Sequence, residues 1–167
     1  MPKKLPLGLQ DFRGIMKDAL LVALLSLTSS CSPDELQETD SYLIFGHFYG
    51  KCLGEQCVET FKLTDTQLFE DSRDDFTGTE FSFDRLLGDA LFQEVKDLRD
   101  ALPKELLQSP SGTFGCPNCA DQGGLLVQYV EKGSVKTWRI DLFKAQVPTY
   151  LHAFVDKVNE KIERINR

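Results

Sequence analysis

The chain has 167 residues, of which 41% are hydrophobic, so its length and apolar content suit one domain and argue against disorder of the whole chain. It carries 19 basic and 26 acidic residues, which gives a formal net charge of −7 at pH 7. Because phosphate backbones repel an acidic domain, we expect no nucleic acid partner.

The N-terminal segment has the pattern of an export signal. An apolar run, 19–27, follows basic residues and ends in small residues before Cys31. The run is too short to span a bilayer. The order of charge, apolar run and small residues is typical of a secretory signal, so we predict a signal peptide over 1–30. A start at Met16 would give a more compact signal, and this alternative stays open.

The residues that precede Cys31, Leu27-Thr28-Ser29-Ser30, resemble a bacterial lipobox of the looser type found in Bacteroidota. This resemblance implies that Cys31 is lipidated, becomes the first residue of the mature chain and attaches it to a membrane. The alternative is a buried N-terminal helix with an unmodified Cys31. The polar segment 31–40 is predicted to be a tether. Its acidic residues resemble a surface-export signal, and both a periplasmic and a surface-facing orientation stay open.

The predicted domain, 41–167, opens with three strands. The segments 42–49 and 58–63 are rich in aromatic and aliphatic residues, and a turn at Thr64 leads to a shorter strand, 66–70. Because consecutive strands joined by short turns pair as hairpins, we expect an antiparallel meander.

A helix should follow, because apolar residues recur at helical spacing. They are Leu87, Leu91, Val95, Leu98 and Leu102. Asp84 is the predicted N-cap, since its carboxylate can accept hydrogen bonds from first-turn amides. Pro103 ends the helix, and one further turn is expected over 103–107.

The C-terminal part predicts a hairpin and a second helix. Strands over 125–131 and 135–142 flank a tight turn at Lys132. Pro148 should begin the final helix. Its apolar stripe is Leu151, Phe154, Val158, Ile162 and Ile165. The expected fold is α+β, an antiparallel sheet of about five strands in the order βββαββα, with both amphipathic helices on one face.

Besides Cys31, the chain has two pairs of cysteines, Cys52 with Cys57 and Cys116 with Cys119. An even number of cysteines in an exported chain favours disulfides. Each pair could close its own loop, or bridges could join the two loops. The sequence leaves both pairings open.

Two other chemistries fit the same cysteines. Cys116-Pro117-Asn118-Cys119 resembles one knuckle of a zinc ribbon, and four thiolates would complete a tetrahedral site, so zinc is the one cofactor that the pattern suggests. A Cys-x-x-Cys can also perform thiol redox chemistry when a helix N-terminus stabilises its first thiolate. Here a predicted strand follows the motif, which argues against thioredoxin-like activity.

Other residues of the segment 115–124 are expected to order it. Asp121 can accept backbone hydrogen bonds. Gly123 and Gly124 do not form a phosphate cradle, because no helix follows them. Neither histidine, His47 or His152, belongs to a recognisable nucleophile motif, so no catalytic residue is predicted.

Several of these features occur together. They are the lipobox-like Cys31, the segment 42–50 followed by Cys52 and Cys57, the loop 115–124, Trp138-Arg139-Ile140-Asp141 and Val147-Pro148. In this combination the chain resembles a family of uncharacterised small lipoproteins of Bacteroidota, a resemblance that implies no activity. We expect an outer-membrane lipoprotein of the cell envelope with a non-enzymatic interaction or ligand-binding domain. The alternative is a thiol redox or zinc-binding lipoprotein.

Overall fold

The computed structural model describes residues 41–49, 58–73 and 80–167. They belong to the second of the two units into which the chain divides, Met1–Glu38 and Thr39–Arg167. No helix in these ranges is long and apolar enough to cross a bilayer. Several predictions fall outside the described residues: the signal peptide 1–30, the start at Met16, the lipidated Cys31, the tether 31–40, and Cys52 with Cys57.

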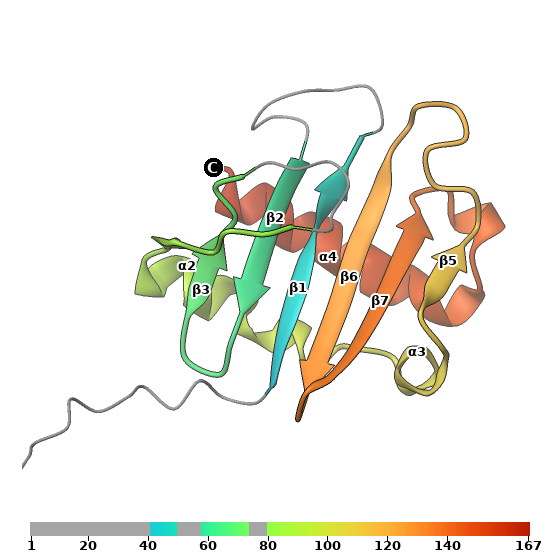
Figure 1. Ribbon diagram of the computed structural model, residues 1–167. Coiled ribbons are helices and arrows are strands. Elements are labelled where there is room, and N and C mark those ends of the chain that lie inside the picture. Colours follow the sequence, from blue (N-terminus) through green and yellow to red (C-terminus); the bar gives the residue numbers. More distant parts are fainter. Residues whose placement is uncertain (1–40, 50–57, 74–79) are drawn as a thin grey trace, which may run out of the picture. The chain divides into compact units, whose positions relative to one another are not determined.

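Seven strands in the described ranges form one sheet, in the order β4-β3-β2-β1-β6-β7-β5 (Figure 1). The strands are β1 Ser41–Phe48, β2 Val58–Leu63, β3 Leu68–Glu70, β4 Arg85–Leu86, β5 Gly112–Phe114, β6 Gly124–Glu131 and β7 Ser134–Asp141. The α-helices in the same ranges are α2 Asp89–Val95, α3 Lys104–Gln108 and α4 His152–Ile165, and short 3-10 turns cover Lys96–Leu98, Lys144–Gln146 and Thr149–Leu151.

The α+β class is confirmed, but the sheet is mixed rather than antiparallel and has more strands than the five expected. β5 pairs with β7 in parallel, whereas the other neighbouring strands pair antiparallel. The two strands that the sequence did not predict, β4 and β5, have only two and three residues. Segments this short are too brief to show an alternating pattern.

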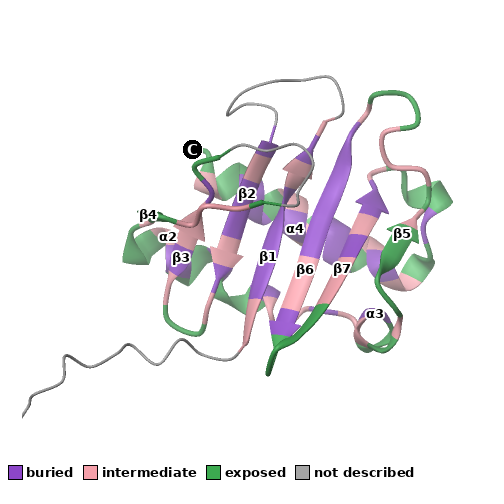
Figure 2. Cartoon of the chain, in the orientation of Figure 1, coloured by how far each residue is buried: buried purple, intermediate pink, exposed green. Residues whose placement is uncertain are grey.

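One face of the sheet packs against the helices and carries the core. Alternate residues of the central strands point to this face, because strand side chains alternate between faces. Those that are almost fully buried include Leu43, Phe45, Phe61, Leu63, Leu125, Val127, Trp138 and Ile140. Figure 1 shows α4 running across the back of this sheet, and Figure 2 shows the burial of β1, β2 and β6. Burying each large apolar side chain contributes about 1.5–3 kcal/mol.

Helix α4 has the predicted apolar stripe. Phe154, Val155, Val158 and Ile162 are buried against the core. Pro148 does not begin the helix directly. It precedes the 3-10 turn Thr149–Leu151, which leads into His152.

The prediction that Asp84 caps the first long helix is wrong. After Asp84 the chain stays extended, because Leu86 pairs with Phe69 in the sheet. Helix α2 therefore begins at Asp89, with Gly88 as its N-cap. The first helix was also expected to continue to Pro103, but α2 ends at Val95 and its 3-10 turn ends at Leu98. The expected further turn after Pro103 is present as α3, and Pro103 is its N-cap.

Candidate functional site

The loop 115–123 joins β5 to β6, although β7 lies between these two strands in the sheet. Because β5 and β7 are parallel, both end at the same end of the sheet, and β6 begins there. The loop therefore crosses over the C-terminal end of β7 (Figure 1).

This end of the sheet is opposite the one at which the domain begins. Phe48 pairs with Gly124, and Ser41 pairs with Glu131. We call the end that contains Phe48, Gly124 and Asp141 the distal end, and the end that contains Ser41 and Glu131 the entry end. The loop 115–123 lies at the distal end.

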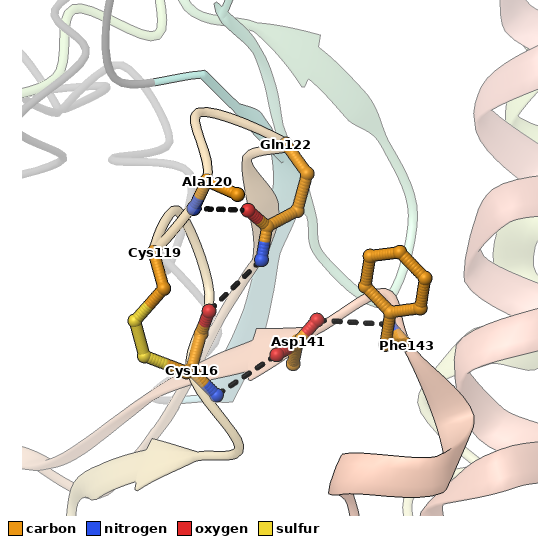
Figure 3. The surroundings of a disulfide bond; sticks show 6 residues. All are labelled: Cys116, Cys119, Ala120, Gln122, Asp141 and Phe143. Atoms are coloured by element: carbon orange, nitrogen blue, oxygen red, sulfur yellow. Dashed lines mark hydrogen bonds between the residues drawn. A yellow bond between two sulfur atoms is a disulfide. The ribbon is translucent and has the colours of Figure 1, made fainter.

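Asp141, the last residue of β7, is fully buried beneath the loop. One carboxylate oxygen accepts the amide hydrogen of Cys116 at 2.8 Å, and the other accepts that of Phe143 at 2.8 Å (Figure 3). A buried carboxylate is costly unless it is hydrogen-bonded, and bonds to a charged acceptor are stronger than neutral ones. Asp141 thus fixes both the start of the loop and the turn that follows β7.

The Gln122 side chain forms hydrogen bonds with two backbone groups of the loop. Its side-chain oxygen accepts the amide hydrogen of Ala120 at 2.7 Å, and its side-chain nitrogen donates to the carbonyl of Cys116 at 2.9 Å (Figure 3). Two backbone hydrogen bonds add to this closure, from Asn118 to Gly123 at 3.1 Å and from Cys119 to Cys116 at 3.2 Å. Side chain and backbone together therefore hold the loop.

The two glycines expected to order the loop lie where no side chain fits. A Cβ on Gly123 would come within 2.2 Å of the Phe48 carbonyl oxygen, and Gly123 also has a φ of 72°. A Cβ on Gly124 would come within 2.7 Å of Pro117. Their role is thus to allow close packing of the loop against β1. Asp121 has a φ of 57°, in the left-handed region.

The structure joins Cys116 to Cys119, with 5.5 Å between their Cα atoms. This is the local one of the two pairings that the sequence left open. Cys116 is half-buried and Cys119 is exposed. In this oxidised form the two sulfurs are not thiolates, so they cannot serve as zinc ligands. Among the described residues, no group of three or more His, Cys, Asp or Glu side chains is placed to hold a metal ion.

Cys52 and Cys57 lie outside the described residues, but the residues that flank their segment are placed. Phe48 pairs with Val58 on one side and with Gly124 on the other. The chain thus leaves β1 and enters β2 next to the point where the loop 115–123 enters β6.

Both histidines hold structural positions. Nε2 of His47 is 2.7 Å from the side-chain oxygen of Asn159 and links β1 to α4. Nε2 of His152 lies 2.8 Å from the carbonyl oxygen of Lys144 and 3.2 Å from that of Val147, so it donates to the turn before α4.

Sequence reasoning did not find three residues of this site: Asp141, Gln122 and Phe143. Asp141 and Cys116 are 25 residues apart, and only the crossing of the loop over β7 brings them together. Phe143 is 58% exposed, although its backbone amide donates to a buried carboxylate. The exposure of Phe143 depends on the tertiary structure, so the sequence did not indicate it.

Comparison with models of protein families and with curated proteins found no match to this chain. A proposal about its function therefore depends on the residues and contacts described above.

Proposed function

We propose that the protein is a lipoprotein of the bacterial cell envelope, held in the outer membrane by lipid on Cys31 and facing the periplasm or the cell surface. Its domain is a non-enzymatic interaction or ligand-binding domain. The support for export is the order of charge, apolar run and small residues before Cys31. The support for a binding role is the geometry of the loop 115–123.

One observation carries the binding role. β1 starts at the entry end and reaches the distal end after eight residues, a length of about 23 Å at the usual rise per residue. The loop 115–123 therefore lies at the end of the sheet opposite Ser41, the first residue that the structure describes. The loop is also held from within by Gln122 and from beneath by Asp141. A loop that is ordered before binding loses little entropy when a partner binds.

The exposed contact residues at this end support a protein partner. Phe143 presents its ring to solvent, and Cys119 and Ala120 are exposed. The backbone amides of Phe143 and Cys116 both donate to Asp141, so the backbone at Phe143 and the start of the loop are fixed relative to each other. Aromatic residues in such positions commonly dominate binding energy.

Anchoring is tested by fractionation of the native host. We expect the wild-type protein in the membrane fraction, released by detergent but not by salt, and the Cys31→Ser protein outside it. Cys119→Ser is the matched control, because it removes a cysteine of the domain and leaves Cys31. Wild-type protein in the soluble fraction, or Cys31→Ser protein still in the membrane, would refute the anchor.

The binding role of the distal end is tested with a photo-crosslinking amino acid introduced at position 143 in place of Phe143. The same amino acid at Lys132, at the entry end, is the control. We expect a crosslinked species from position 143 and none from position 132. Equal crosslinking from both positions, or none from 143, would count against the distal end as the binding surface.

A second candidate function is thiol redox or zinc chemistry at Cys52, Cys57, Cys116 and Cys119. The exposure of Cys119 in the bonded pair favours it, because a partner thiolate can reach that sulfur. Zinc binding would require the pair to be reduced. Metal analysis and a measured reduction potential test this candidate. A potential below about −300 mV, typical of structural disulfides, together with no zinc in the reduced protein, would exclude it.

A further inference from the structure

A cavity of about 510 Å³ opens at the entry end of the sheet. The rings of Phe92 and Tyr129 form part of its wall, and five charged residues form most of the rest. Tyr129 also lines a smaller hollow of about 210 Å³ nearby. Volumes in this range accommodate small ligands.

Three of the charged residues in the wall have partners within the protein. Arg99 is paired with Asp65 and also donates to the Ser41 hydroxyl at 2.8 Å. Asp97 is paired with lysines of α4, Lys157 at 2.8 Å and Lys161 at 3.1 Å. These charges are largely neutralised before any ligand enters.

The remaining two charges, Lys96 and Asp100, are not neutralised. The Lys96 ammonium donates to the uncharged side-chain oxygen of Gln93 at 2.6 Å. Within the part of the chain that the structure describes, the Asp100 carboxylate makes no hydrogen bond or ion pair. Lys96 begins the 3-10 turn Lys96–Leu98, Asp100 follows that turn, and both residues line the same cavity. The cavity therefore presents one unmatched positive and one unmatched negative charge.

We propose that this cavity binds a small zwitterion, whose anionic group contacts Lys96 and Arg99 and whose ammonium group contacts Asp100. A guanidinium has five N–H donors, so Arg99 can bind an anion while it keeps its bonds to Asp65 and Ser41. The rings of Phe92 and Tyr129 cover the short carbon chain between the two charged groups of the ligand. A ligand with one charge alone would leave either Lys96 or Asp100 unmatched.

An aminoethyl phosphate has this chemistry, either as the headgroup of a membrane lipid or as a free solute. The cavity lies at the end of the sheet where β1 begins, and Arg99 is bonded to Ser41 there. If Cys31 carries lipid as proposed, the headgroups of the membrane are an available source of this ligand. The headgroup source thus rests on the proposed anchor, whereas the binding chemistry does not.

The test is titration of the full, unacylated chain with O-phosphorylethanolamine, followed by NMR chemical shifts or calorimetry. We expect saturable binding that weakens with salt. Asp100→Asn and Lys96→Gln should each weaken binding by about fivefold, the size expected for one exposed ion pair. Asp84→Asn and Lys104→Gln remove exposed charges outside the cavity and should bind like the wild type. No saturation, or equal losses in all four variants, would overturn the proposal.

Two further titrations sharpen the result. Inorganic phosphate and ethanolamine each carry half of the ligand and should bind more weakly than O-phosphorylethanolamine. Equal binding of phosphate alone would show an anion site and contradict a zwitterion site. Unchanged melting temperatures of Asp100→Asn and Lys96→Gln should show that neither variant lost binding through unfolding.

Vesicle binding distinguishes a lipid headgroup from a free solute as the source of the ligand. Cosedimentation of the unacylated chain with phosphatidylethanolamine vesicles, but not with phosphatidylglycerol vesicles, would assign the headgroup as the ligand. Binding of O-phosphorylethanolamine without cosedimentation would assign a free solute. Because the unacylated chain is used throughout, failure of these titrations leaves the anchor at Cys31 unaffected, and failure of the fractionation test leaves the cavity unaffected.

Discussion

Asp141 lies between two backbone segments that depend on it. Its buried carboxylate accepts the amide hydrogens of Cys116 and Phe143. Both amides would lose this partner if the side chain were removed, and a hydrogen bond to a charged acceptor contributes about 1.5–3 kcal/mol. The start of the loop 115–123 and the turn after β7 therefore share one acceptor, a side chain that makes no contact with solvent.

Asp141→Ala should lower the free energy of unfolding by about 3–5 kcal/mol, because two charge-assisted hydrogen bonds are lost and two amides are left without acceptors. Urea unfolding followed by circular dichroism measures this. Asp156→Ala is the control, since Asp156 forms an exposed pair with Lys144, and such pairs contribute less than about 1 kcal/mol. Equal losses in the two variants would contradict the role given to Asp141.

Gly123→Ala should destabilise the domain by about 2 kcal/mol or more, because a positive φ and a close backbone carbonyl both oppose a Cβ. Gly112→Ala is the matched control, since a Cβ added at Gly112 would meet no atom within 4 Å and the φ of this residue is not in the left-handed region. Thermal unfolding compares the two. A Gly123→Ala protein as stable as Gly112→Ala would show that the loop does not pack against β1 as described.

At the scale of elements, the loop 115–123 is held by several interactions of which the disulfide is one. The bond between Cys116 and Cys119 closes a very short loop, so its entropic contribution is about 2 kcal/mol. Gln122, Asp141 and the backbone bonds of the loop do not depend on it. The domain should therefore keep its fold when the disulfide is absent.

The double variant Cys116→Ser and Cys119→Ser should lose about 2 kcal/mol of stability while its amide NMR spectrum changes only in and near 115–123. The spectrum of the reduced wild-type protein should change in the same region. Loss of signal dispersion across the sheet would contradict this, because it would mean that the disulfide holds the fold rather than one loop.

The contact of α2 and its 3-10 turn with α4 should be sensitive to acid. Burial opposes ionisation of Asp97, but hydrogen bonds from Lys157 and Lys161 outweigh it and lower the pKa of this carboxyl. A lowered pKa in the folded state adds stability above the unfolded value of about 3.9, and this stability is lost as the pH falls through the folded pKa.

Asp97→Asn should therefore reduce stability at neutral pH and have a smaller effect near pH 2. The expected change is small, because Asp97 is half exposed. Melting temperatures of the wild type and the variant from pH 7 to pH 2 measure it, with Asp89→Asn as control. Parallel curves for the wild type and Asp97→Asn would exclude a contribution of this ion pair to folding.

At the scale of the whole molecule, the elements predicted from the sequence are those whose apolar residues recur at the spacing of a strand or a helix. The strand Val58–Leu63 has the predicted bounds. Four members of the predicted stripe are buried, Leu151 in the turn before α4 and Phe154, Val158 and Ile162 in α4, whereas Ile165 is half-buried. β5 was missed, because it is a three-residue parallel strand after Ser109-Pro110-Ser111, a pattern typical of a chain break. Its parallel pairing with β7 is a long-range property, and this pairing carries the loop over Asp141.

The candidate site was predictable only in part for the same reason. The cysteine spacing indicated a closed loop at Cys116 and Cys119. Nothing in the local sequence indicated that the loop would lie on Asp141, because that contact depends on the order of strands in the sheet. The cavity at the entry end also combines residues from separate elements, Thr64, Phe92 and Tyr129 among them.

The measurement that tests the central claim most directly is intact mass spectrometry of the protein from its native membranes, with and without alkylation of free thiols. The account predicts a chain that begins at Cys31, carries the mass of the lipid, and has Cys116 and Cys119 protected from alkylation. A chain that retains residues before Cys31, has no lipid and is alkylated at both Cys116 and Cys119 would contradict it.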